Sequence, residues 1–436
     1  MQAYLDAVAT VELTRRTGKV IALAGHSIEA SGPDTTLGEI CEINPGRMPA
    51  RLLAEVVAVK PGRVILMPYG DLRGVGCGDE VAASGELPQM PVGDALLGRV
   101  VDAFGGPLDG KPDPKAGAYR PVHAAPLNPL TRPRIKDLLE TGVRAIDGLL
   151  PMGRGQRMGI FAGSGVGKST LLGMLARDVK ADVNVIALIG ERGREVREFI
   201  EKHLGDAGLA RSVVVVATSD QPALVRTRAA YAATAMAEHF RDQGRQVLLM
   251  MDSVTRFAMA RREIGLTAGE PPTARGYTPS VFAEIPALCE RCGTTDGGGS
   301  ITALYTVLVE GDDFNEPIAD ILRATLDGHI MLSREFAHEG HFPAIDVLQS
   351  VSRLATDLAS GEEQKTMATV VELLAVYERN RQMVDMGAYR VGSNPQVDRA
   401  IQLYPAIRTV LRQSILESTP RQETMRRLRN ALGAKA

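Results

Sequence analysis

A glycine-rich segment that ends in Lys168 and Ser169 carries the clearest chemical signal in the sequence. It follows the apolar run Met158–Phe161 and precedes an amphipathic helix that we expect over Thr170–Val179. Glycines allow backbone N–H groups to surround a phosphate at a helix N-terminus. Lys168 adds a mobile charge for the β- and γ-phosphates, and Ser169 adds a hydroxyl for Mg²⁺. The segment predicts a nucleotide site made by Gly163, Ser164, Gly165, Val166, Gly167, Lys168, Ser169 and Thr170.

Two carboxylates are expected to complete the chemistry of this loop. Asp252 follows the apolar run Val247–Met251, which we expect to be the strand beside the loop. We predict that its carboxylate is a ligand on the outer face of the metal. In many hydrolases with such a loop a Glu comes next, but here Ser253 does, so the water-activating base is expected elsewhere. Glu191, just after the run Val183–Ile189, is the candidate base. From the residues alone, a solvated loop charge is an equally weighted interpretation of Glu191.

The elements that position these residues fall into three parts of an α/β protein. The chain has 436 residues, of which 44% are hydrophobic and 23% charged, and this excludes a small stapled scaffold and a mainly disordered chain. Short β-rich runs punctuated by Gly, Pro and Asp predict a small β-barrel over residues 1–90. Apolar strands that alternate with amphipathic helices predict a parallel sheet within residues 91–353. Apolar spacing in Thr366–Asp385 and Val397–Leu416 predicts a helical domain over residues 354–436.

Charge and apolar patterning exclude two classes of partner. The net charge is −2, and the first 90 residues carry 11 acidic and 8 basic side chains with only Tyr4 and Tyr69 as aromatics. This barrel lacks the basic groove and stacking aromatics of an oligonucleotide-binding barrel. The longest apolar runs are about five residues, against roughly 20 for a membrane span, and no secretory signal is visible. We therefore expect a cytoplasmic protein that binds no nucleic acid.

The cysteines, histidines and basic tail carry weaker signals. Four cysteines do not form a disulfide framework in a chain of this length, and we interpret Cys289 and Cys292 as helix packing residues rather than a redox or zinc pair. His338 and His341 lack further metal ligands nearby. Residues 408–436 carry seven basic and two acidic side chains. Such a tail could contact acidic lipids at the membrane periphery, although a solvated face or a partner surface is more usual.

Five further motifs are distinctive when they are taken together. They are Gly190-Glu191-Arg192-Gly193-Arg194-Glu195, Ala217-Thr218-Ser219-Asp220-Gln221-Pro222, Asp252-Ser253-Val254-Thr255-Arg256, Arg275-Gly276-Tyr277-Thr278-Pro279-Ser280 and Gly311-Asp312-Asp313-Phe314-Asn315-Glu316-Pro317. The chain thereby resembles the ATPases of type III protein export, and among them the flagellar export ATPase family, which is related to the catalytic subunit of rotary ATP synthases. The resemblance runs from about residue 10 to 415. It implies a RecA-like P-loop domain between a β-barrel and a C-terminal α-helical domain, in a homohexamer with sites at subunit interfaces.

The resemblance implies roles for residues around the phosphate loop. Lys168 and Ser169 match the phosphate-loop residues, Glu191 matches the catalytic carboxylate, and Arg192 matches its neighbour at the site. Asp252 matches the acid on the metal side. Non-catalytic ring subunits carry Gln where Glu191 stands, so the Glu favours a subunit that hydrolyses ATP.

Two more residues match the family outside the loop. Arg353, in Ser350-Val351-Ser352-Arg353, matches the arginine finger that reaches into a neighbouring subunit, with a helix-face arginine as the alternative. Phe342, in His341-Phe342-Pro343-Ala344-Ile345-Asp346, matches the adenine-side segment. The family usually has Tyr at this position, and Phe keeps an aromatic face on which the base can stack. The alternative interpretation is that Phe342 is a residue of the hydrophobic core. Tyr389 is left out of the site.

The resemblance implies an Mg²⁺-dependent ATP hydrolase of flagellar type III export that energises docking, chaperone release and unfolding of export substrates. The implied partners are stator-like regulatory and central-stalk subunits, the export gate, and the substrates with their chaperones, at the cytoplasmic face of the inner membrane. The equivalent ATPase of a virulence-type injectisome is the alternative, since none of these motifs excludes it. A ring helicase or terminator is disfavoured by the acidic, aromatic-poor barrel, and a nucleotide-binding scaffold without turnover is the last alternative.

Overall fold

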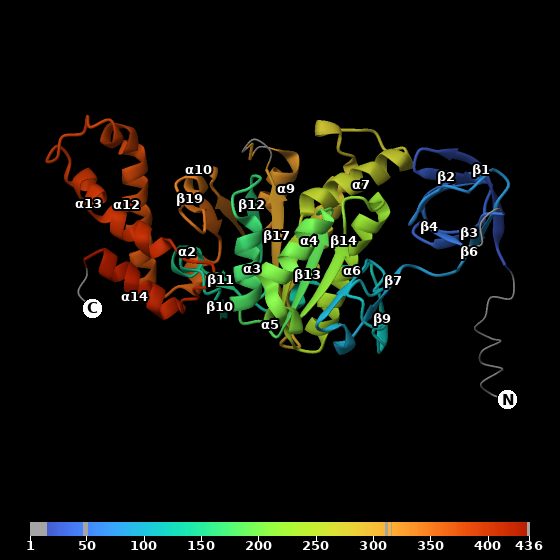
Figure 1. Cartoon of the computed structure of the whole chain (residues 1–436), viewed down its shortest axis with the longest axis horizontal. Helices are drawn as coiled ribbons and strands as arrows, with labels where there is room; N and C mark the ends of the chain where they lie inside the picture. The colour runs from blue at the N-terminus through green and yellow to red at the C-terminus, as the bar shows by residue number, and fades with distance from the viewer. Residues whose placement is uncertain (1–14, 47–50, 310–312, 315, 434–436) are drawn as a thin grey trace.

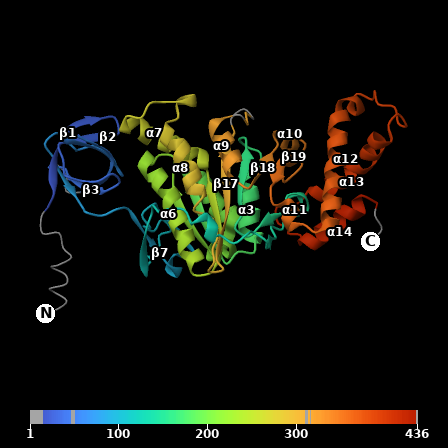
Figure 2. The ribbon, with the colours of Figure 1, turned by 180° about the vertical axis from the view of Figure 1, so that it is seen from behind.

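Three units follow one another along the long axis of the molecule. The computed structural model describes residues 15–46, 51–309, 313, 314 and 316–433. A β-barrel lies at one end, an α/β unit in the middle and a helical unit at the other end, and the view from behind shows the same order (Figures 1 and 2). None of the helices in the described residues combines the length and apolar character needed to cross a bilayer.

The N-terminal unit is a closed barrel of six antiparallel strands in the order β1-β2-β5-β4-β3-β6. The strands are β1 (Thr17–Ala24), β2 (Ser27–Ala30), β3 (Ile40–Asn44), β4 (Leu52–Lys60), β5 (Arg63–Pro68) and β6 (Glu80–Ala83). Alternate side chains such as Ile43, Val56 and Leu66 fill the interior, because successive residues of a strand point to opposite faces. The predicted barrel is confirmed.

The central unit is built on a nine-stranded sheet. Its strands are β8 (Arg99–Val101), β12 (Arg157–Ala162), β13 (Val183–Ile189), β14 (Ser212–Ala217), β15 (Gln246–Asp252), β16 (Gly293–Thr294), β17 (Ser300–Leu308), β18 (Gly328–Leu332) and β19 (Ile345–Ser352). The strands pair in parallel from β18 across to β8, which confirms the predicted parallel sheet. Only β16 and the edge strand β19 are antiparallel within this described sheet. Two small ribbons flank it: β7 (Gln89–Val92) with β9 (Ala118–Pro121), and β10 (Leu138–Leu139) with β11 (Met152–Gly153).

One expectation about strand order is wrong. The strand that ends in Asp252 was expected beside the strand that leads into the glycine-rich segment, but β17 lies between them. Gly159 of β12 pairs with Tyr305 of β17, which in turn pairs with Met251 of β15. Apolar runs locate strands along the chain, but strand order depends on pairing between distant segments, which those runs do not encode.

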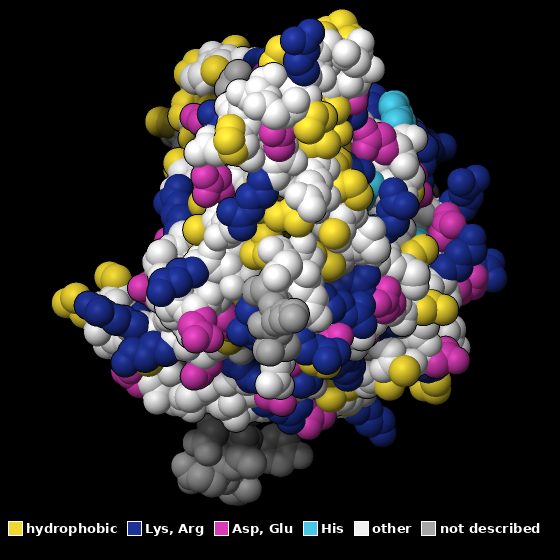
Figure 3. Space-filling view, turned by 90° about the vertical axis from the view of Figure 1, so that its left-hand side faces the viewer, with side chains coloured by type: hydrophobic (Ala, Val, Ile, Leu, Met, Phe, Trp, Pro, Cys, Tyr) yellow, Lys and Arg dark blue, Asp and Glu magenta, His cyan; other side chains and the backbone are white. Residues whose placement is uncertain are grey.

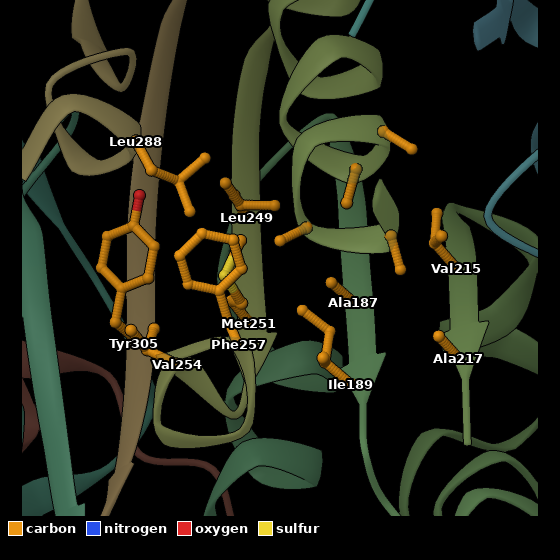
Figure 4. Close-up of a cluster of buried hydrophobic side chains, with 14 of the residues drawn as sticks. Ala187, Ile189, Val215, Ala217, Leu249, Met251, Val254, Phe257, Leu288 and Tyr305 are labelled. Atoms are coloured by element: carbon orange, nitrogen blue, oxygen red, sulfur yellow. The ribbon is translucent and has the colours of Figure 1, made fainter. Parts of the chain in front are cut away.

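Helices cover both faces of the sheet. One face carries α6 (Ala223–Asp242), α7 (Val254–Ala268), α8 (Pro279–Cys289) and α9 (Pro317–Thr325). The other carries α2 (Arg144–Leu149), α3 (Lys168–Asp178), α4 (Gly193–Glu198), the π-helical η3 (Phe199–Leu204) and α5 (Gly205–Ala210). On β15, Leu249 and Met251 meet Phe257 of α7 on the first face (Figure 4), whereas Leu248 and Met250 pack on the second. Such double burial explains why these strands are continuous apolar runs.

The C-terminal unit is helical, as predicted. Its main helices are α12 (Gly361–Asp385), α13 (Pro395–Leu411) and α14 (Arg421–Ala431), while the short α10 (Arg334–His338) and α11 (Ala355–Leu358) lie nearer the sheet. Tyr377 and Tyr404 stack between α12 and α13, with ring centroids 3.6 Å apart. Seen from this end of the molecule, basic and acidic side chains are interspersed over the surface (Figure 3).

The second predicted helix of this unit is shorter than expected and ends at Leu411 instead of Leu416. Beyond it the chain turns onto α2. Gln413 Nε2 donates to the carbonyl of Gly142 at 2.7 Å, and the backbone N–H of Arg144 donates to Gln413 Oε1 at 2.8 Å. The backbone N–H of Gln413 donates to the carbonyl of Phe342 at 2.8 Å instead of to a carbonyl of the preceding turn. The basic tail is also partly a packing surface, because Arg421 is buried and donates to the carbonyl of Asp147.

A buried ion pair ties the segment after α8 to α6. Arg291 donates to both carboxylate oxygens of Glu238 at 2.8 Å, and the two side chains are only 2% and 3% exposed. Another nitrogen of Arg291 donates to the Val122 carbonyl at 2.7 Å. This guanidinium therefore joins three distant segments of the central unit.

Arg291→Met should lower the free energy of unfolding by about 3 kcal/mol or more, because the buried Glu238 carboxylate loses its bidentate partner. Urea unfolding followed by circular dichroism measures this loss. Adding Glu238→Met to the same chain should recover much of it, whereas Arg197→Met, which removes an exposed pair with Glu201, should leave the midpoint in place. Equal midpoints for Arg291→Met and Arg197→Met would contradict this account.

A candidate nucleotide site at the carboxyl edge of the sheet

A cavity of about 550 Å³ opens where β12, β13 and β17 end. The predicted nucleotide residues that line it are Gly163, Ser164, Gly165, Gly167, Lys168, Ser169 and Thr170, joined by Glu191 and Arg192. Val166 is buried in the core below, where it anchors the loop instead of lining the cavity. The carboxyl ends of parallel strands are where open α/β sheets bind ligands. The structure thus brings most of the predicted loop residues to one cavity.

The loop owes its shape to two glycines in the left-handed region. Gly165 has φ 78° and Gly167 has φ 92°, a conformation that other L-residues rarely adopt. α3 begins at Lys168, directly after Gly167. The first backbone N–H groups of a helix have no intrahelical partner, so this end of α3 can bind an anion.

Lys168 lies between two carboxylates. Its Nζ is 3.5 Å from Glu191 Oε1, and it donates a hydrogen bond to Asp252 Oδ1. Burial alone would lower the pKa of Lys168, but the charges of Asp252 and Glu191 outweigh burial, and the pKa is raised. The ammonium therefore stays charged. Asp252 does not itself line the cavity, because it sits behind this ammonium.

Glu191 is an unusually basic carboxylate. Burial raises its pKa, the negative charge of Asp252 raises it further, and Lys168 only partly offsets them, so the pKa reaches about 7. Glu195, the third residue of α4, also lines the cavity, and its own pKa is lowered by a hydrogen bond with Glu191. A carboxylate with a pKa near neutrality can accept a proton from water at physiological pH. The solvated loop charge that the sequence left open does not describe Glu191.

Three charged residues at the cavity were not predicted as site residues. Glu195 and Arg256 belong to motifs already noted, and Arg334 begins α10 after β18. Arg256 lies in the first turn of α7, and its side chain packs on Gly190, where an added Cβ would lie 2.9 Å from the Arg256 Cβ. The signal available for Arg256 and Arg334 was their position in the first turn of the helix that follows a strand ending at this edge. Arg192 lies at the mouth of the cavity with its side chain 82% exposed.

Phe342 and Arg353 lie outside the lining of this cavity. Phe342 is 43% exposed, and its ring borders the loop, since a Cβ added to Gly167 would lie 3.6 Å from it. A core Phe is therefore the wrong description. Arg353 directly follows the edge strand β19, is exposed, and donates to the Arg323 carbonyl at 2.9 Å. It is not on a helix. Of the motif 311–317, residues 311, 312 and 315 fall outside the described part of the chain.

Both Cys289 and Cys292 pack in the core as expected, although only Cys289 lies on a helix, since α8 ends there. Cys289 and Cys292 are fully buried beside Tyr305, and burial raises the pKa of the Cys292 thiol to about 11, so neither is a ready nucleophile. In the ranges that the structure describes, no group of three or more His, Cys, Asp and Glu side chains is placed to hold a metal ion. Tyr389 hydrogen bonds to Asp398 within the helical unit.

Comparisons with known proteins agree with this geometry. Residues 142–352 match the model of the ATP synthase alpha/beta family, nucleotide-binding domain, and residues 359–430 match the T3SS EscN ATPase C-terminal domain. A flagellum-specific ATP synthase of Bacillus subtilis (strain 168) is 50% identical over 99% of both chains. A type 3 secretion system ATPase of Xanthomonas euvesicatoria is 50% identical over 93% of this chain and 92% of its own length.

Solved structures agree as well. The assembled ATPase EscN of the enteropathogenic E. coli type III secretion system aligns with a TM-score of 0.91 and 45% identity over 95% of this chain and all of that one. EscN in complex with its central stalk EscO aligns with a TM-score of 0.87 and 44% identity, over the same shares. The chain therefore belongs to the ATP synthase alpha/beta family, in the group formed by flagellum-specific ATP synthases and type III secretion ATPases.

Proposed function

We propose that this protein is the ATP hydrolase of a flagellar type III protein export apparatus. The observation that carries the proposal is the pair formed by Glu191 and Lys168 in the loop cavity, with Glu191 Oε1 3.5 Å from Lys168 Nζ and a pKa near 7. A phosphate-binding loop alone would serve a binding protein equally well. A basic carboxylate beside that loop is what hydrolysis additionally requires.

In the proposed reaction, the backbone N–H groups of Gly163–Thr170 and the Lys168 ammonium bind the phosphates of ATP. Lys168 must then leave Asp252, which it contacts in this structure. Glu191 orients the attacking water and accepts its proton at a carboxylate oxygen. Arg192, at the mouth, adds positive charge close to the phosphates. Phe342 offers a partly exposed ring beside Gly167 on which the adenine stacks.

The residues around Lys168 also suit Mg²⁺. Ser169 offers a hydroxyl and Asp252 a carboxylate, and hard oxygen atoms are the ligands that this ion prefers. Asp252 already holds one cationic group, the Lys168 ammonium, so its carboxylate suits a cation. When bound with ATP, Mg²⁺ would neutralise charge on the β- and γ-phosphates. We propose Ser169 and Asp252 as the residues on the metal side.

Arg353 is proposed to act in a neighbouring subunit of a homohexamer. It is exposed at the edge of the sheet and does not line the cavity of its own chain, which supports a role across an interface. The assembled state of EscN supports an oligomer, and its complex with EscO supports a central-stalk partner. Stator-like regulators, an export gate, and substrates with their chaperones remain proposals from the family resemblance. So do the location at the cytoplasmic face of the inner membrane and the peripheral lipid contact.

We propose that the three domains expected from the sequence, 1–90, 91–353 and 354–436, have different functions. The central domain, which holds the loop cavity, would bind and hydrolyse ATP. A virulence-type injectisome is the second candidate, because the Xanthomonas relative is also 50% identical. The Bacillus relative matches more of this chain, 99% against 93%, and favours the flagellar system. Flagellar genes beside this one would support the first candidate, and effector genes the second.

Glu191→Gln should keep binding of Mg·ATP and lower turnover by about two to four decades, because the amide cannot accept the proton. Phosphate release and fluorescent-nucleotide binding measure the two effects. Glu198→Gln, on the exposed side of α4, is the matched control and should keep full turnover. Retained turnover in Glu191→Gln would move the base elsewhere, and no turnover in the unaltered protein would leave only a nucleotide-binding scaffold.

The pH profile offers an independent check on Glu191. Because its raised pKa keeps it protonated in acid, kcat/KM should fall about tenfold per pH unit below about pH 7. An ordinary Glu, with a pKa near 4.3, would keep kcat/KM constant down to about pH 5. Binding of Mg·ATP to Glu191→Gln over the same range separates ionisation of the nucleotide from that of the base. A flat profile between pH 5.5 and 8 would exclude Glu191 as the titrating base.

Arg353→Ala should lower turnover by about three to five decades if the guanidinium completes a neighbour's site. Arg353→Lys keeps the charge but loses the planar fork, so it should recover only part. Mixing Arg353→Ala with Lys168→Ala subunits should restore activity, because some hybrid interfaces then hold an intact Lys168 and an intact Arg353. Absence of rescue at every mixing ratio would mean that Arg353 acts within its own chain or is structural.

A further inference from the structure

We propose that Thr306 is a positioning residue, which holds the Asp252 carboxylate in place for the metal side of the site when Lys168 moves to the phosphates. The inference rests on the proposed function and adds a residue to it. Thr306 belongs to no motif discussed above. It lies on β17, the strand that the sequence did not place between β12 and β15.

The topology puts Thr306 between the two halves of the site. In register, Thr306 is opposite Ile160 of β12, and its neighbour Tyr305 is opposite Met251 of β15. Thr306 and Leu304 lie on the same face of β17, because residues two apart on a strand share a face. Leu304 packs in the core on the α3 side, together with Met250, and Asp252 follows Met250 by the same two-residue step. Thr306, Asp252 and the start of α3 therefore share one side of the sheet.

The contact between the two side chains is short and enclosed. Thr306 Oγ1 lies 2.7 Å from Asp252 Oδ1, and Thr306 has no exposed surface. The same hydroxyl is 3.3 Å from the Met251 carbonyl. A hydroxyl has one hydrogen, and an ionised carboxylate can only accept, so the hydrogen goes to the shorter, charged contact. Thr306 therefore donates to Asp252.

Asp252 Oδ1 thus has two donors in this structure, Lys168 and Thr306. Among the described residues these are its only hydrogen-bond donors. When Lys168 turns toward bound phosphates, Thr306 is the donor that stays, because it is fixed within β17. Without it, the buried carboxylate would lose its last donor at that moment, and an unsatisfied buried charge is costly. Thr306 thereby lowers the cost of releasing Lys168 and keeps the carboxylate oriented.

The test is the Mg²⁺ concentration that half-saturates binding of a fluorescent ATP analogue, measured by fluorescence on the full chain. Thr306→Val keeps the shape and removes the donor. It should raise this concentration about tenfold, the lower end of what losing a hydrogen bond to a metal-site residue costs. Thr306→Ser, which keeps the hydroxyl, should restore it to within about twofold of the unaltered protein. The apparent Mg²⁺ requirement of ATP turnover should move in parallel.

Thr302→Val is the matched control on the same strand and the same face. Thr302 is also buried, and its hydroxyl accepts a hydrogen bond from the Gly155 N–H at 2.8 Å, four residues away from Thr306. It should lose thermal stability comparable to Thr306→Val but keep the Mg²⁺ requirement. If Thr306→Val needs no more Mg²⁺ than Thr302→Val, or if Thr306→Ser is as impaired as Thr306→Val, the inference is overturned.

Two further outcomes are separable. If Thr306→Val does not fold, Thr306→Ala removes the same donor with less crowding and takes its place in the comparison with Thr306→Ser. If the unaltered protein shows no Mg²⁺-dependent binding of nucleotide, the proposed function fails, and the role of Thr306, which rests on it, fails with it. A normal response in the unaltered protein with an unchanged one in Thr306→Val rejects only the role of Thr306.

Discussion

The central unit is organised around one largely buried positive charge, the ammonium of Lys168, whose side chain is 12% exposed. A buried charge is tolerated only when it is paired, and its two partners come from different strands, Glu191 after β13 and Asp252 at the end of β15. Those strands are paired so that Leu188 lies opposite Asp252, which brings both carboxylates to the same edge. The loop glycines then place the start of α3 at that edge. Strand register, loop conformation and helix position thus all serve one electrostatic arrangement.

Local features of this fold are readable in the sequence because they arise from local physics. Strands buried on both faces must be continuous apolar runs, so β13 and β15 were located correctly. Their order in space was not, because β17 enters between β12 and β15 through pairing across the sheet. The end of α13 was misplaced for a similar reason. Apolar spacing continues past Leu411, whereas the backbone N–H of Gln413 donates to the carbonyl of Phe342, a tertiary contact that the spacing does not encode.

The functional site, like the fold, was predicted where it depends on local sequence and missed where it depends on distant segments. Motif residues such as Lys168 and Glu191 could be named because strand, loop and helix follow one another directly. Arg256 and Arg334 were not predicted as site residues, because charged residues are common in the first turn of a helix. Only the arrangement of the neighbouring strands shows that these two line the cavity. The raised pKa of Glu191 was equally hidden, since it depends on burial and on Asp252, which is far away in the sequence. What sequence reasoning lacked was the set of neighbours that each side chain would meet.

Gln413 connects the junction between the central and helical units to residues beside the phosphate loop. Its side chain is hydrogen bonded to Gly142 and Arg144, while its backbone N–H donates to the carbonyl of Phe342 at 2.8 Å. Phe342 in turn borders the phosphate loop at Gly167. A chain cut after the last strand of the sheet would therefore keep every loop residue yet lose the backbone donor that fixes the wall beside them. The helical unit is, in this sense, part of the architecture of the cavity, and an excised central unit would not reproduce it.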